Sequence, residues 1–499
     1  MHSVQRVVVS PNNTPDVFAG VSVAVTNECG QLALSTCQLL NAHGAHARAI
    51  DTAVLVEDTT GAHSTGRNDA NHDVADLLLV TTMMGNGTVI ERHWQALLTI
   101  RAFVTAGGQS VIVLQDTDGR FESGPSNGWH GGAAALARTA ALEWPETSVR
   151  CIDIAVNPHD TDETAHRLLK AMTTSEREVG IDLTGQLHVL RPHSYVHVDP
   201  TSHTSNNDVQ NNSAADTNTR HEHGVWLVSG GARGVTADCI KALATRASGC
   251  FVLLGRSNPI DWPADIPVTD DITVLRRELA ARALANGERP VPKQIEALAR
   301  SMLASEEIRD TLVRLSDSGV DAHYYACDIT NRQHVMDVVK QVRDSHGQIS
   351  ALVHGAGVLA DSLIADKTYA QLERVFETKV HGLQNLLTAL DDATLSHVAL
   401  FSSAAAFYGN KGQADYAMAN EILNRVAHAL KRHLPNASIK SFNWGPWASG
   451  MVDATLARYF EDRGIALIPV AQGAEIFARE MLDGDSANVE VLVGDTWEQ

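Results

Sequence analysis

Three polar side chains in the C-terminal part of the chain, Lys379, Ser403 and Tyr416, are of the types needed to reduce a carbonyl group. Such a reduction needs a hydride donor and a proton donor on the carbonyl oxygen. A free tyrosine has a pKa near 10, too high for efficient proton transfer at neutral pH. A nearby ammonium favours the phenolate and lowers that pKa, and a serine hydroxyl can hold and polarise the carbonyl oxygen.

The spacing around Tyr416 raises a question about the lysine. Tyr416 opens the helical segment "ADYAMANEILNRVAHALKRHL", and a lysine four residues later is typical of hydride-transfer enzymes, yet that position holds Asn420. Lys379 lies upstream instead, in the helical segment "ETKVHGLQNLLTAL". We expect the two helices to lie side by side, so that exchanging Lys and Asn leaves both head groups in the same small space. Tyr416, Ser403, Lys379 and Asn420 are therefore the candidate catalytic residues.

A glycine-rich turn supplies a candidate cofactor site. The segment "SGGARGVT" follows an apolar strand and opens a helix, whose free N–H groups and dipole favour a phosphate. Gly230 and Gly234 permit a tight turn and a close approach of a pyrophosphate. Glycine turns after strands are common, so the motif alone is weak. The candidate residues are Ser229, Gly230, Gly231, Ala232, Arg233, Gly234 and Val235.

The next strand indicates which dinucleotide binds. It ends in "LLGRS", where an acidic residue would favour NAD by accepting a hydrogen bond from the ribose 2′-hydroxyl. This chain has Arg256 and Ser257 there. A guanidinium matches a 2′-phosphate, so NADPH is favoured over NADH, and Arg233 could add positive charge. The alternative is an ordinary surface arginine.

Two further strand ends complete the expected cofactor site. Asp328, followed by Ile329, is placed to accept a hydrogen bond from the adenine amino group. The following strand ends in "HGAG", with small residues where the backbone must pass close to a cofactor. His354 is equally compatible with a core position, and we assign it no acid–base role. The residues of this segment are His354, Gly355, Ala356 and Gly357.

Short apolar strands alternate with helices along most of the chain, which predicts an α/β fold with parallel, doubly covered sheets. Residues 197–223 contain few large apolar side chains and predict a flexible linker. We therefore expect a Rossmann-like structural subdomain at 1–196, degenerate because it lacks the spaced glycines. A catalytic Rossmann-like subdomain follows at 224–499.

An insertion at about residues 258–320 interrupts the second subdomain. Its segment "PKQIEALARSMLASEEIRDTLVRLSDSG" has the apolar spacing of one or two amphipathic helices. A nucleotide-binding fold does not require it. Such helices could cover the adenosine side of the cofactor or contact a neighbouring domain, and the sequence favours neither.

The composition excludes several classes of partner. The 499 residues contain 39 basic and 59 acidic side chains, a net charge of −20, which argues against nucleic acid and anionic membranes. The six cysteines show no CxxC spacing, so we expect reduced thiols and no metal. The N-terminal residues lack the apolar run of a signal peptide, and no stretch approaches the ~20 apolar residues of a membrane span. We expect a cytoplasmic location.

Taken together, these segments resemble the ketoreductase domains of modular polyketide synthases and multifunctional fatty acid synthases, within the short-chain dehydrogenase superfamily. Ordinary short-chain dehydrogenases carry the Lys and Asn in the opposite arrangement. The resemblance rests on "SGGARGVT", "LLGRS", "HGAGVLADS", "ETKVHG", "LFSSAAAFYGNKGQADYAMANEILN" and "NWGPWASGM", and "GWHGGAAALARTAALEWPETSVRCIDI" resembles the degenerate subdomain of those proteins.

The insertion resembles a segment of the ketoreductases of polyunsaturated fatty acid synthases. This resemblance implies a 3-oxoacyl substrate on the phosphopantetheine arm of an acyl carrier protein domain, and contacts with other domains of a parent synthase. It implies that Tyr416 protonates the keto oxygen, that Lys379 also binds the nicotinamide ribose, and that Asn420 supports Lys379 and a proton-relay water. Pro446 and Trp447 would hold the nicotinamide carboxamide, and Met451 would begin a mobile helix over the substrate.

Two departures from the family pattern concern stereochemistry. Members that make the 3R alcohol often have Leu-Asp-Asp where this chain has Leu359-Ala360-Asp361, so one aspartate remains. The other class tends to have Trp where this chain has Tyr408. The resemblance leans toward 3R, with Asp361 and Tyr408 as candidate substrate residues. A ketoreductase of an ordinary polyketide module and a non-catalytic cofactor-binding scaffold are the alternative functions.

Overall fold

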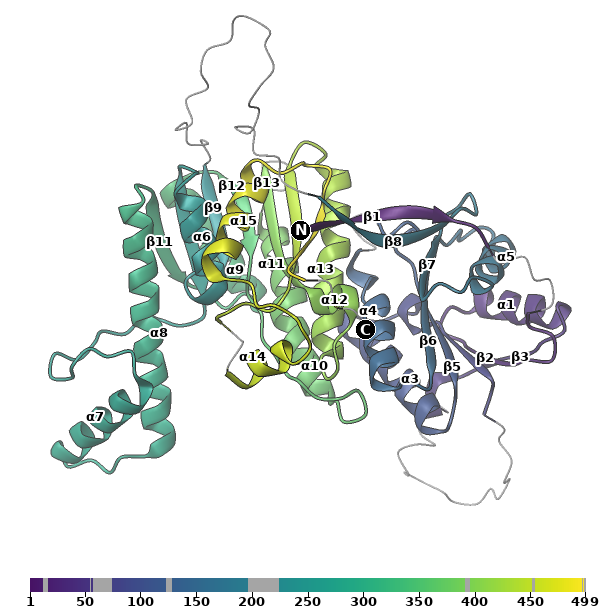
Figure 1. Ribbon diagram of the computed structural model, residues 1–499, viewed down its shortest axis with the longest axis horizontal. Helices are drawn as coiled ribbons and strands as arrows, with labels where there is room; N and C mark the ends of the chain where they lie inside the picture. The colour runs from purple at the N-terminus through teal and green to yellow at the C-terminus, as the bar shows by residue number, and fades with distance from the viewer. Residues whose placement is uncertain are drawn as a thin grey trace, which may run out of the picture.

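The computed structural model describes residues 1–11, 17–53, 55–56, 74–122, 128–195, 224–390, 395–450, 454–495 and 497. The expected linker at 197–223 and the candidate residue Met451 lie outside these residues. The described chain forms two α/β halves joined edge to edge (Figure 1). This is the predicted fold class.

The C-terminal half is a parallel sheet in the order β11-β10-β9-β12-β13-β14-β15. The chain starts in the middle, winds outward to one edge, and then returns past its starting strand toward the other edge. The carboxyl ends of β9 and β12 therefore separate at a topological switch point, where α/β folds bind ligands. Its strands are β9 Val225–Ser229, β10 Cys250–Gly255, β11 Asp321–Ala326, β12 Ile349–His354, β13 His397–Ser403, β14 Ser438–Trp444 and β15 Glu490–Val493.

Helices cover both faces of this sheet, and none of the described helices is long and apolar enough to span a bilayer. The helical segment that runs from α10 to α11 is irregular in the middle, where the π-helical turn η3, Glu377–His381, separates the two helices. Such turns are rare and are often found at functional sites. The helices of the half are α6 Gly234–Ala244, α9 Arg332–His346, α10 Tyr369–Phe376, α11 Gly382–Ala389, α12 Ala404–Tyr408, α13 Ala414–His433, α14 Ala454–Glu461 and α15 Val470–Leu482.

The N-terminal half repeats this winding with one outer strand fewer, in the parallel order β3-β2-β4-β5-β6-β7. Its strands are β1 His2–Val9, β2 Ser22–Thr26, β3 His46–Ile50, β4 Leu77–Val80, β5 Ser110–Gln115, β6 Ser148–Ile154, β7 Glu178–Ile181 and β8 Leu187–Ser194. Its helices are α1 Gln31–Ala42, α3 Val89–Thr105, α4 Ala133–Glu143 and α5 Thr161–Met172, with short 3₁₀ turns η1 Thr82–Met84 and η2 Gly128–His130.

The first strand joins the two halves. β1 pairs antiparallel with β8 along its whole length, from His2 opposite Ser194 to Val9 opposite Leu187. Its other edge pairs with β15, placing His2 opposite Leu492. All fifteen described strands therefore belong to one continuous sheet, which sequence patterns within each half do not predict.

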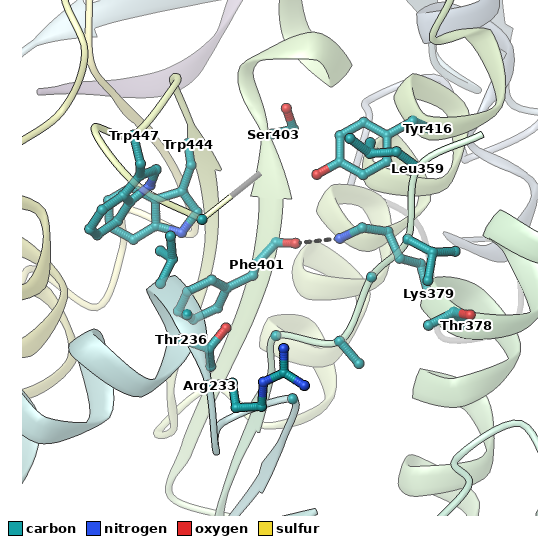
Figure 2. A pocket seen from close by; sticks show the side chains of 18 of the residues that line it. Arg233, Thr236, Leu359, Thr378, Lys379, Phe401, Ser403, Tyr416, Trp444 and Trp447 are labelled. Carbon is teal, nitrogen blue, oxygen red and sulfur yellow. Dashed lines mark hydrogen bonds between the residues drawn. The ribbon is translucent and has the colours of Figure 1, made fainter. Parts of the chain in front are cut away.

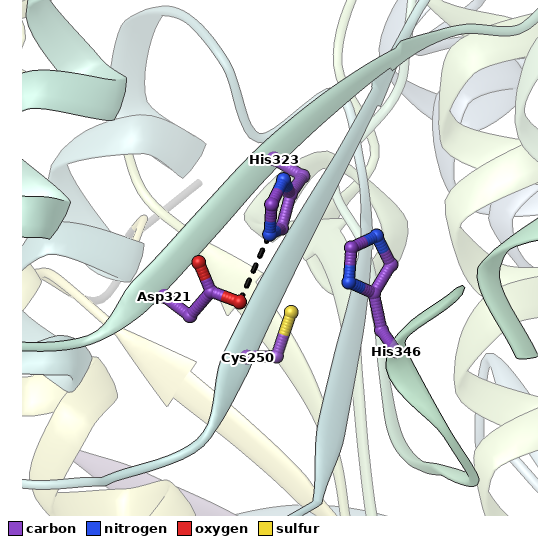
Figure 3. Close-up of side chains that lie close together, drawn as sticks. All are labelled: Cys250, Asp321, His323 and His346. Carbon is purple, nitrogen blue, oxygen red and sulfur yellow. Dashed lines mark hydrogen bonds and ion pairs between the residues drawn. The ribbon is translucent and has the colours of Figure 1, made fainter.

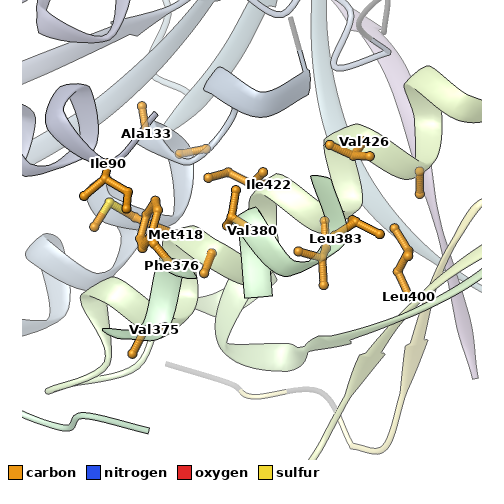
Figure 4. Close-up of a cluster of buried hydrophobic side chains, with 14 of the residues drawn as sticks. Ile90, Ala133, Val375, Phe376, Val380, Leu383, Leu400, Met418, Ile422 and Val426 are labelled. Atoms are coloured by element: carbon orange, nitrogen blue, oxygen red, sulfur yellow. The ribbon is translucent and has the colours of Figure 1, made fainter. Parts of the chain in front are cut away.

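The halves also share a core. Figure 4 shows Ile90 and Ala133, from α3 and α4, packed with Met418 and Ile422 on α13 and with Phe376 on α10. All five side chains are buried. Burying a large aliphatic or aromatic side chain contributes roughly 1.5–3 kcal/mol. The N-terminal half therefore stabilises α13, the helix that carries Tyr416.

The insertion forms two helices, α7 Ile272–Ala285 and α8 Pro292–Asp317, which project from the edge of the catalytic half beside β11 (Figure 1). A proline in the first turn of α8 suits a helix start, where its missing N–H leaves no intrahelical bond unmade. Ile308 and Leu315 of α8 join the core of the catalytic half, whereas Leu275 and Leu279 of α7 form a small separate core with Met302 of α8. The α7–α8 helical hairpin is therefore attached to the core of the catalytic half through α8.

Candidate active site

A cavity of about 1030 Å³ lies at the carboxyl ends of the strands of the catalytic half. It reaches from the glycine turn after β9 to the start of α13, and it also contacts the loop after β14. This volume is at the upper end of the range for small-molecule and cofactor sites. The cavity lies at the switch point that the strand order creates.

Lys379 lies on η3 and is buried in the wall of this cavity (Figure 2). Its Nζ donates a hydrogen bond of 2.8 Å to the Phe401 carbonyl oxygen and lies 5.3 Å from the centroid of the Tyr416 ring. Burial lowers the pKa of Lys379 from 10.5 to about 7. An added Cβ on Gly357 would lie 2.8 Å from Lys379 Cε, so the lysine side chain would have to shift to make room for it.

Tyr416 stands in the first turn of α13, and its hydroxyl points into the space between Ser403 and Phe401 (Figure 2). Burial raises the pKa of Tyr416, while side-chain hydrogen bonds from Asn420 and Ser403 lower it. Ser403 ends β13, and its Oγ accepts a 3.2 Å hydrogen bond from the Ala405 N–H at the start of α12. The structure therefore brings Ser403, Lys379 and Tyr416 together from three different elements.

Asn420 lies one turn further along α13 and is fully buried beneath Tyr416. Its Nδ2 donates a 2.8 Å hydrogen bond to the Tyr416 carbonyl oxygen. The backbone of Asn420 is held in turn, because its carbonyl oxygen accepts from the Ser402 hydroxyl at 3.0 Å. The side chain expected to support Lys379 is therefore bonded to the tyrosine, and it lies behind the cavity wall.

The glycine turn has the shape that a dinucleotide requires. Gly230 has a φ of +72°, and an added Cβ would lie 2.8 Å from the Ala356 backbone nitrogen. Gly355 must also lack a side chain, because an added Cβ would lie 2.3 Å from Thr236 Oγ1. These glycines let the end of β12 and the start of α6 approach closely, leaving a backbone cradle at a helix N-terminus that fits a diphosphate.

Known proteins match this arrangement. The KR domain family matches residues 224–449, which include the glycine turn and all four candidate catalytic residues. This chain is a ketoreductase domain of the polyketide synthase type. Such domains reduce the keto group of a β-ketoacyl thioester with a nicotinamide cofactor.

Two curated relatives show how far the likeness extends. A polyunsaturated fatty acid synthase polypeptide of Thraustochytrium sp. is 35% identical over 414 residues, 78% of this chain. The chain spans only 14% of that relative's length. A phenolphthiocerol/phthiocerol polyketide synthase polypeptide of Mycobacterium tuberculosis is 35% identical over 170 residues, 34% of this chain and 7% of the relative.

Solved ketoreductase structures have the same fold. An A-type ketoreductase from a modular polyketide synthase superposes with a TM-score of 0.70 at 20% identity, covering 99% of this chain and 92% of the other. A ketoreductase domain from the bacillaene assembly line gives 0.65 at 18% identity, covering 99% and 96%. The match covers both halves, so the degenerate half belongs to the shared architecture.

At the far end of the ketoreductase cavity, Arg256 and Ser257 line the wall. Tyr324, from the neighbouring strand β11, donates a 2.6 Å hydrogen bond to the Ser257 carbonyl oxygen and so fixes this loop. Glu307 and Ile308 of α8 line the same end, and Glu307 forms an ion pair with Arg233. One side of the insertion therefore reaches the cavity end where we expect the adenosine.

Most of the other predicted residues also line the cavity. Asp361 is held by Gln413 Nε2, which donates to its carboxylate at 3.0 Å. Trp447 packs edge-on against Trp444, with ring centroids 4.8 Å apart. The remaining predicted residues in the lining are Gly230, Ala232, Arg233, Gly234, Val235, Ile329, Gly355, Ala356, Gly357 and Pro446.

Ser229 and His354 instead form a hydrogen-bonded pair beneath the floor of the cavity. Ser229 Oγ and His354 Nδ1 are 2.7 Å apart, and His354 Nε2 donates to the Lys379 carbonyl oxygen at 3.0 Å. Burial lowers the pKa of His354 to about 3, so the ring is neutral. These side chains position the backbone of Lys379, a role that the strand-end pattern did not predict.

Three other predicted residues also lie outside the lining. The Asp328 carboxylate accepts hydrogen bonds from the Thr330 N–H and hydroxyl at 3.1 and 2.9 Å. Gly231 faces the core, where an added Cβ would lie 2.2 Å from Val228 Cγ1. Tyr408 stacks on Trp497 at 5.7 Å, and it is Trp497 that lines the cavity.

Sequence reasoning missed several lining residues. Glu307 and Tyr324 belong to the insertion and to an edge strand, for which no motif assigns a ligand. Lys411 lies inside the segment "YGNKGQADY", where its nearness to Tyr416 could have identified it. Trp497 also lines the cavity, and no local pattern in the sequence indicates that it does.

Proposed function

We propose that this ketoreductase uses NADPH to reduce a 3-oxoacyl thioester, carried on the phosphopantetheine arm of an acyl carrier protein domain, to the 3-hydroxyacyl thioester. The observation that carries the proposal is a single cavity with a proton-transfer group at one end and a cationic strand end at the other. Lys379, Ser403 and Tyr416 line the first end, and Arg256 lines the second.

The residues around Tyr416 account for the protonation of the keto oxygen. The bound cofactor supplies a hydride to the keto carbon. The Ser403 hydroxyl donates a hydrogen bond that polarises the keto oxygen, and Tyr416 transfers its phenolic proton to the same oxygen as negative charge develops there. The Lys379 ammonium stabilises the phenolate that remains.

Lys379 can also restore the tyrosine proton. With its pKa near 7, the ammonium is acidic enough to pass a proton to the phenolate, and it can be protonated again at neutral pH. Its Nζ is fixed by the Phe401 carbonyl oxygen rather than by a carboxylate. A carboxylate partner would raise the pKa and hold the proton more tightly. Asn420 keeps the backbone of Tyr416 in place during this exchange.

The preference for NADPH rests on Arg256. A guanidinium at the end of the second strand matches the geometry of a ribose 2′-phosphate, and Arg256 and Ser257 both line the cavity. Arg233 is engaged with Glu307, so it carries less free positive charge toward a phosphate than the sequence suggested. Gly230, Gly234, Gly355 and the start of α6 would hold the diphosphate.

The proposed pathway is polyunsaturated fatty acid synthesis. The match to the Thraustochytrium synthase extends over 78% of the chain, whereas the match to the phthiocerol synthase covers 34%. The domain would then work in the cytoplasm beside other domains of a parent synthase. A ketoreductase of an ordinary polyketide module remains the alternative.

The test is NADPH oxidation with a 3-oxoacyl thioester of a pantetheine mimic. We expect turnover with NADPH, much slower turnover with NADH, and a fall of roughly 10²–10⁴-fold in kcat for Tyr416→Phe. Tyr369→Phe is the matched control, since Tyr369 packs against Trp94 away from the cavity. Equal rates for wild type and Tyr416→Phe would refute the proposed mechanism. Bound NADPH without turnover, even on a carrier-linked substrate, would favour the scaffold alternative.

A further inference from the structure

A second group of reactive side chains lies at the opposite end of the catalytic sheet from the cavity. Cys250, Asp321, His323 and His346 each direct one donor atom into a common space (Figure 3). The four donor atoms, a thiol sulfur, a carboxylate oxygen and two imidazole nitrogens, all lie within 4.8 Å of one another. Neither the KR family match nor the proposed reduction assigns these residues a role.

The fold brings the four residues together from three elements. Cys250 and Asp321 are the first residues of β10 and β11 and are paired in the parallel register. His323 lies two residues after Asp321, on the same face of the strand. His346 is the last residue of α9. Spacing along the chain does not indicate this group, because its members are separated by up to 96 positions (Cys250 to His346).

We propose that Cys250, Asp321, His323 and His346 bind a divalent transition-metal ion, with zinc the best chemical match. Zinc takes four ligands from Cys, His and Asp, at about 2.3 Å to sulfur and about 2.0–2.2 Å to nitrogen or oxygen. Two ligand atoms on one ion are therefore at most about 4.5 Å apart. Small side-chain rotations would bring the four donor atoms within bonding distance of one ion. A mixed set of S, N and O donors disfavours magnesium and calcium, which prefer oxygen ligands.

The surrounding contacts already orient the ligands. The Tyr325 hydroxyl lies 2.8 Å from His346 Nε2, which leaves Nδ1 of that ring for the metal. A partner on the outer nitrogen is typical of metal-binding histidines. The two imidazole rings are tilted by 32° with centroids 4.1 Å apart, and His323 Nε2 lies 2.9 Å from the Asp321 carboxylate.

Cys250 would bind the metal as a thiolate, because the ion displaces the thiol proton, as is usual for cysteine ligands. The simpler alternative is an Asp–His pair beside a half-buried cysteine, which would bind no ion.

The position of the group indicates a structural role. The residues start β10 and β11, whereas Gly255 and Cys327 at the other ends of these strands line the cofactor cavity. A bound ion would join β10, the edge strand β11 and the end of α9. It would raise the stability of this edge, from which the α7–α8 hairpin projects, and take no part in hydride transfer.

The test uses the full chain, purified without a histidine tag and stripped with a chelator. We expect one equivalent of Co²⁺ to give a thiolate-to-cobalt charge-transfer absorption that Cys250→Ser abolishes and the matched control Cys29→Ser retains. Zn²⁺ should compete for the same site and raise the Tm. His346→Gln should weaken Zn²⁺ binding by more than about 100-fold, beyond the effect of losing an outer-sphere partner, while the exposed control His159→Gln leaves it unchanged.

A milder variant guards against misfolding. Tyr325→Phe keeps all four ligands and removes the outer-sphere hydroxyl, so Zn²⁺ affinity should fall by roughly 10–100-fold with the cobalt thiolate band still present. Absence of the thiolate band in the wild-type protein would overturn the proposal. Equal Zn²⁺ affinity in wild type, Cys250→Ser and His346→Gln would also overturn it, because the ion would then bind elsewhere.

Discussion

The two halves of the chain place the same strand–turn–helix unit at the middle of their sheets, yet the two turns differ in what fills the crevice beside them. In the catalytic half, the crevice between β9 and β12 is bordered by Gly230 and Gly355 and opens into the cavity. In the N-terminal half, side chains bridge the corresponding crevice between β2 and β4. The Thr81 N–H donates to Thr26 Oγ1 at 2.8 Å, and Thr81 Oγ1 lies 3.2 Å from Glu28 Oε2.

This difference separates what the fold provides from what the site requires. A doubly wound sheet provides a crevice at its switch point in both halves. The crevice can bind a dinucleotide when the residues around it have side chains small enough for the diphosphate to approach the backbone. With two threonines and a glutamate there, the same fold serves as a support, and its helices α3 and α4 pack against α10 and α13.

The sharpest way to test this comparison is to add the same methyl group to both turns. Gly230→Ala should weaken NADPH binding by about 100-fold or more, because its Cβ would lie 2.8 Å from the Ala356 nitrogen and displace the cradle. Gly30 has a φ of +53°, but an added Cβ there would meet nothing within 4 Å. Gly30→Ala should therefore lower the free energy of unfolding by about 1–2 kcal/mol and leave NADPH binding unchanged. Fluorescence titration with NADPH and urea unfolding measure the two effects. Equal loss of affinity in both variants would contradict the comparison.

The supporting half can be tested through Glu143 at the end of α4. Its carboxylate accepts hydrogen bonds from the N–H groups of Ile364 and Gly412 at 2.6 and 2.8 Å, which are in the two loops that flank Asp361 and Tyr416. Hydrogen bonds to charged groups contribute about 1.5–3 kcal/mol. Glu143→Ala should therefore lower kcat/KM about tenfold or more.

The matched control is Glu146→Ala, an exposed carboxylate three residues further along. Steady-state kinetics of both variants, with Tm as a check on folding, provide the measurement. If Glu143→Ala lost stability but kept full kcat/KM, the N-terminal half would support the fold without positioning the site.

The smallest expected effect is a pair of opposite pH slopes in the stability of the cofactor-free protein. Burial raises the pKa of Asp153, in the N-terminal half, from 3.8 to about 7, so the folded state holds this proton more tightly and stability falls as pH rises from about 4 to 7. Burial lowers the pKa of Lys379 from 10.5 to about 7, so the unfolded state binds the extra proton and stability rises from pH 7 toward 10.

Each group contributes a slope of up to about 1.4 kcal/mol per pH unit within its window. Urea unfolding over a pH series should show that Asp153→Asn flattens the acid limb and Lys379→Met flattens the alkaline limb. A wild-type curve that rises through the acid window, or a Lys379→Met curve with an unchanged alkaline limb, would contradict the assignments.

The sequence predicted those parts of the fold and site that local residue patterns determine. The apolar strands that precede Gly230 and Arg256, and the strand that ends at Ser403, are predictable because strand, turn and helix follow one another directly. Lys379 and Asn420 lie on recognisable helices as expected, but only Lys379 lines the cavity, whereas the Asn420 side chain bonds to the Tyr416 carbonyl oxygen. The π-helical turn that carries Lys379 was missed, because no residue type marks it.

Contacts between distant segments account for the other failures. Ser229 and His354 stand at strand ends like cofactor ligands, but their side chains bond to each other beneath the cavity floor. Glu307 lines the cavity because α8 packs beside β11 at the edge of the sheet, and Trp497 lines it from a position far along the chain. Such placements depend on tertiary packing, which residue spacing does not record.

The pairing of β1 with β15 has a consequence for the order in which the protein folds. One of the two partner strands of residues 2–9, residues 490–493, leaves the ribosome almost five hundred residues after them. Contacts this distant in sequence slow folding, and an edge strand without its partner is a site of aggregation. Residues 187–194 can pair with one edge of β1 before β15 has been synthesised, while the other edge of β1 has no partner. Production of the catalytic half by itself would leave the edge of β15 that faces β1 without a partner, so we expect stable folding to need both halves on one chain.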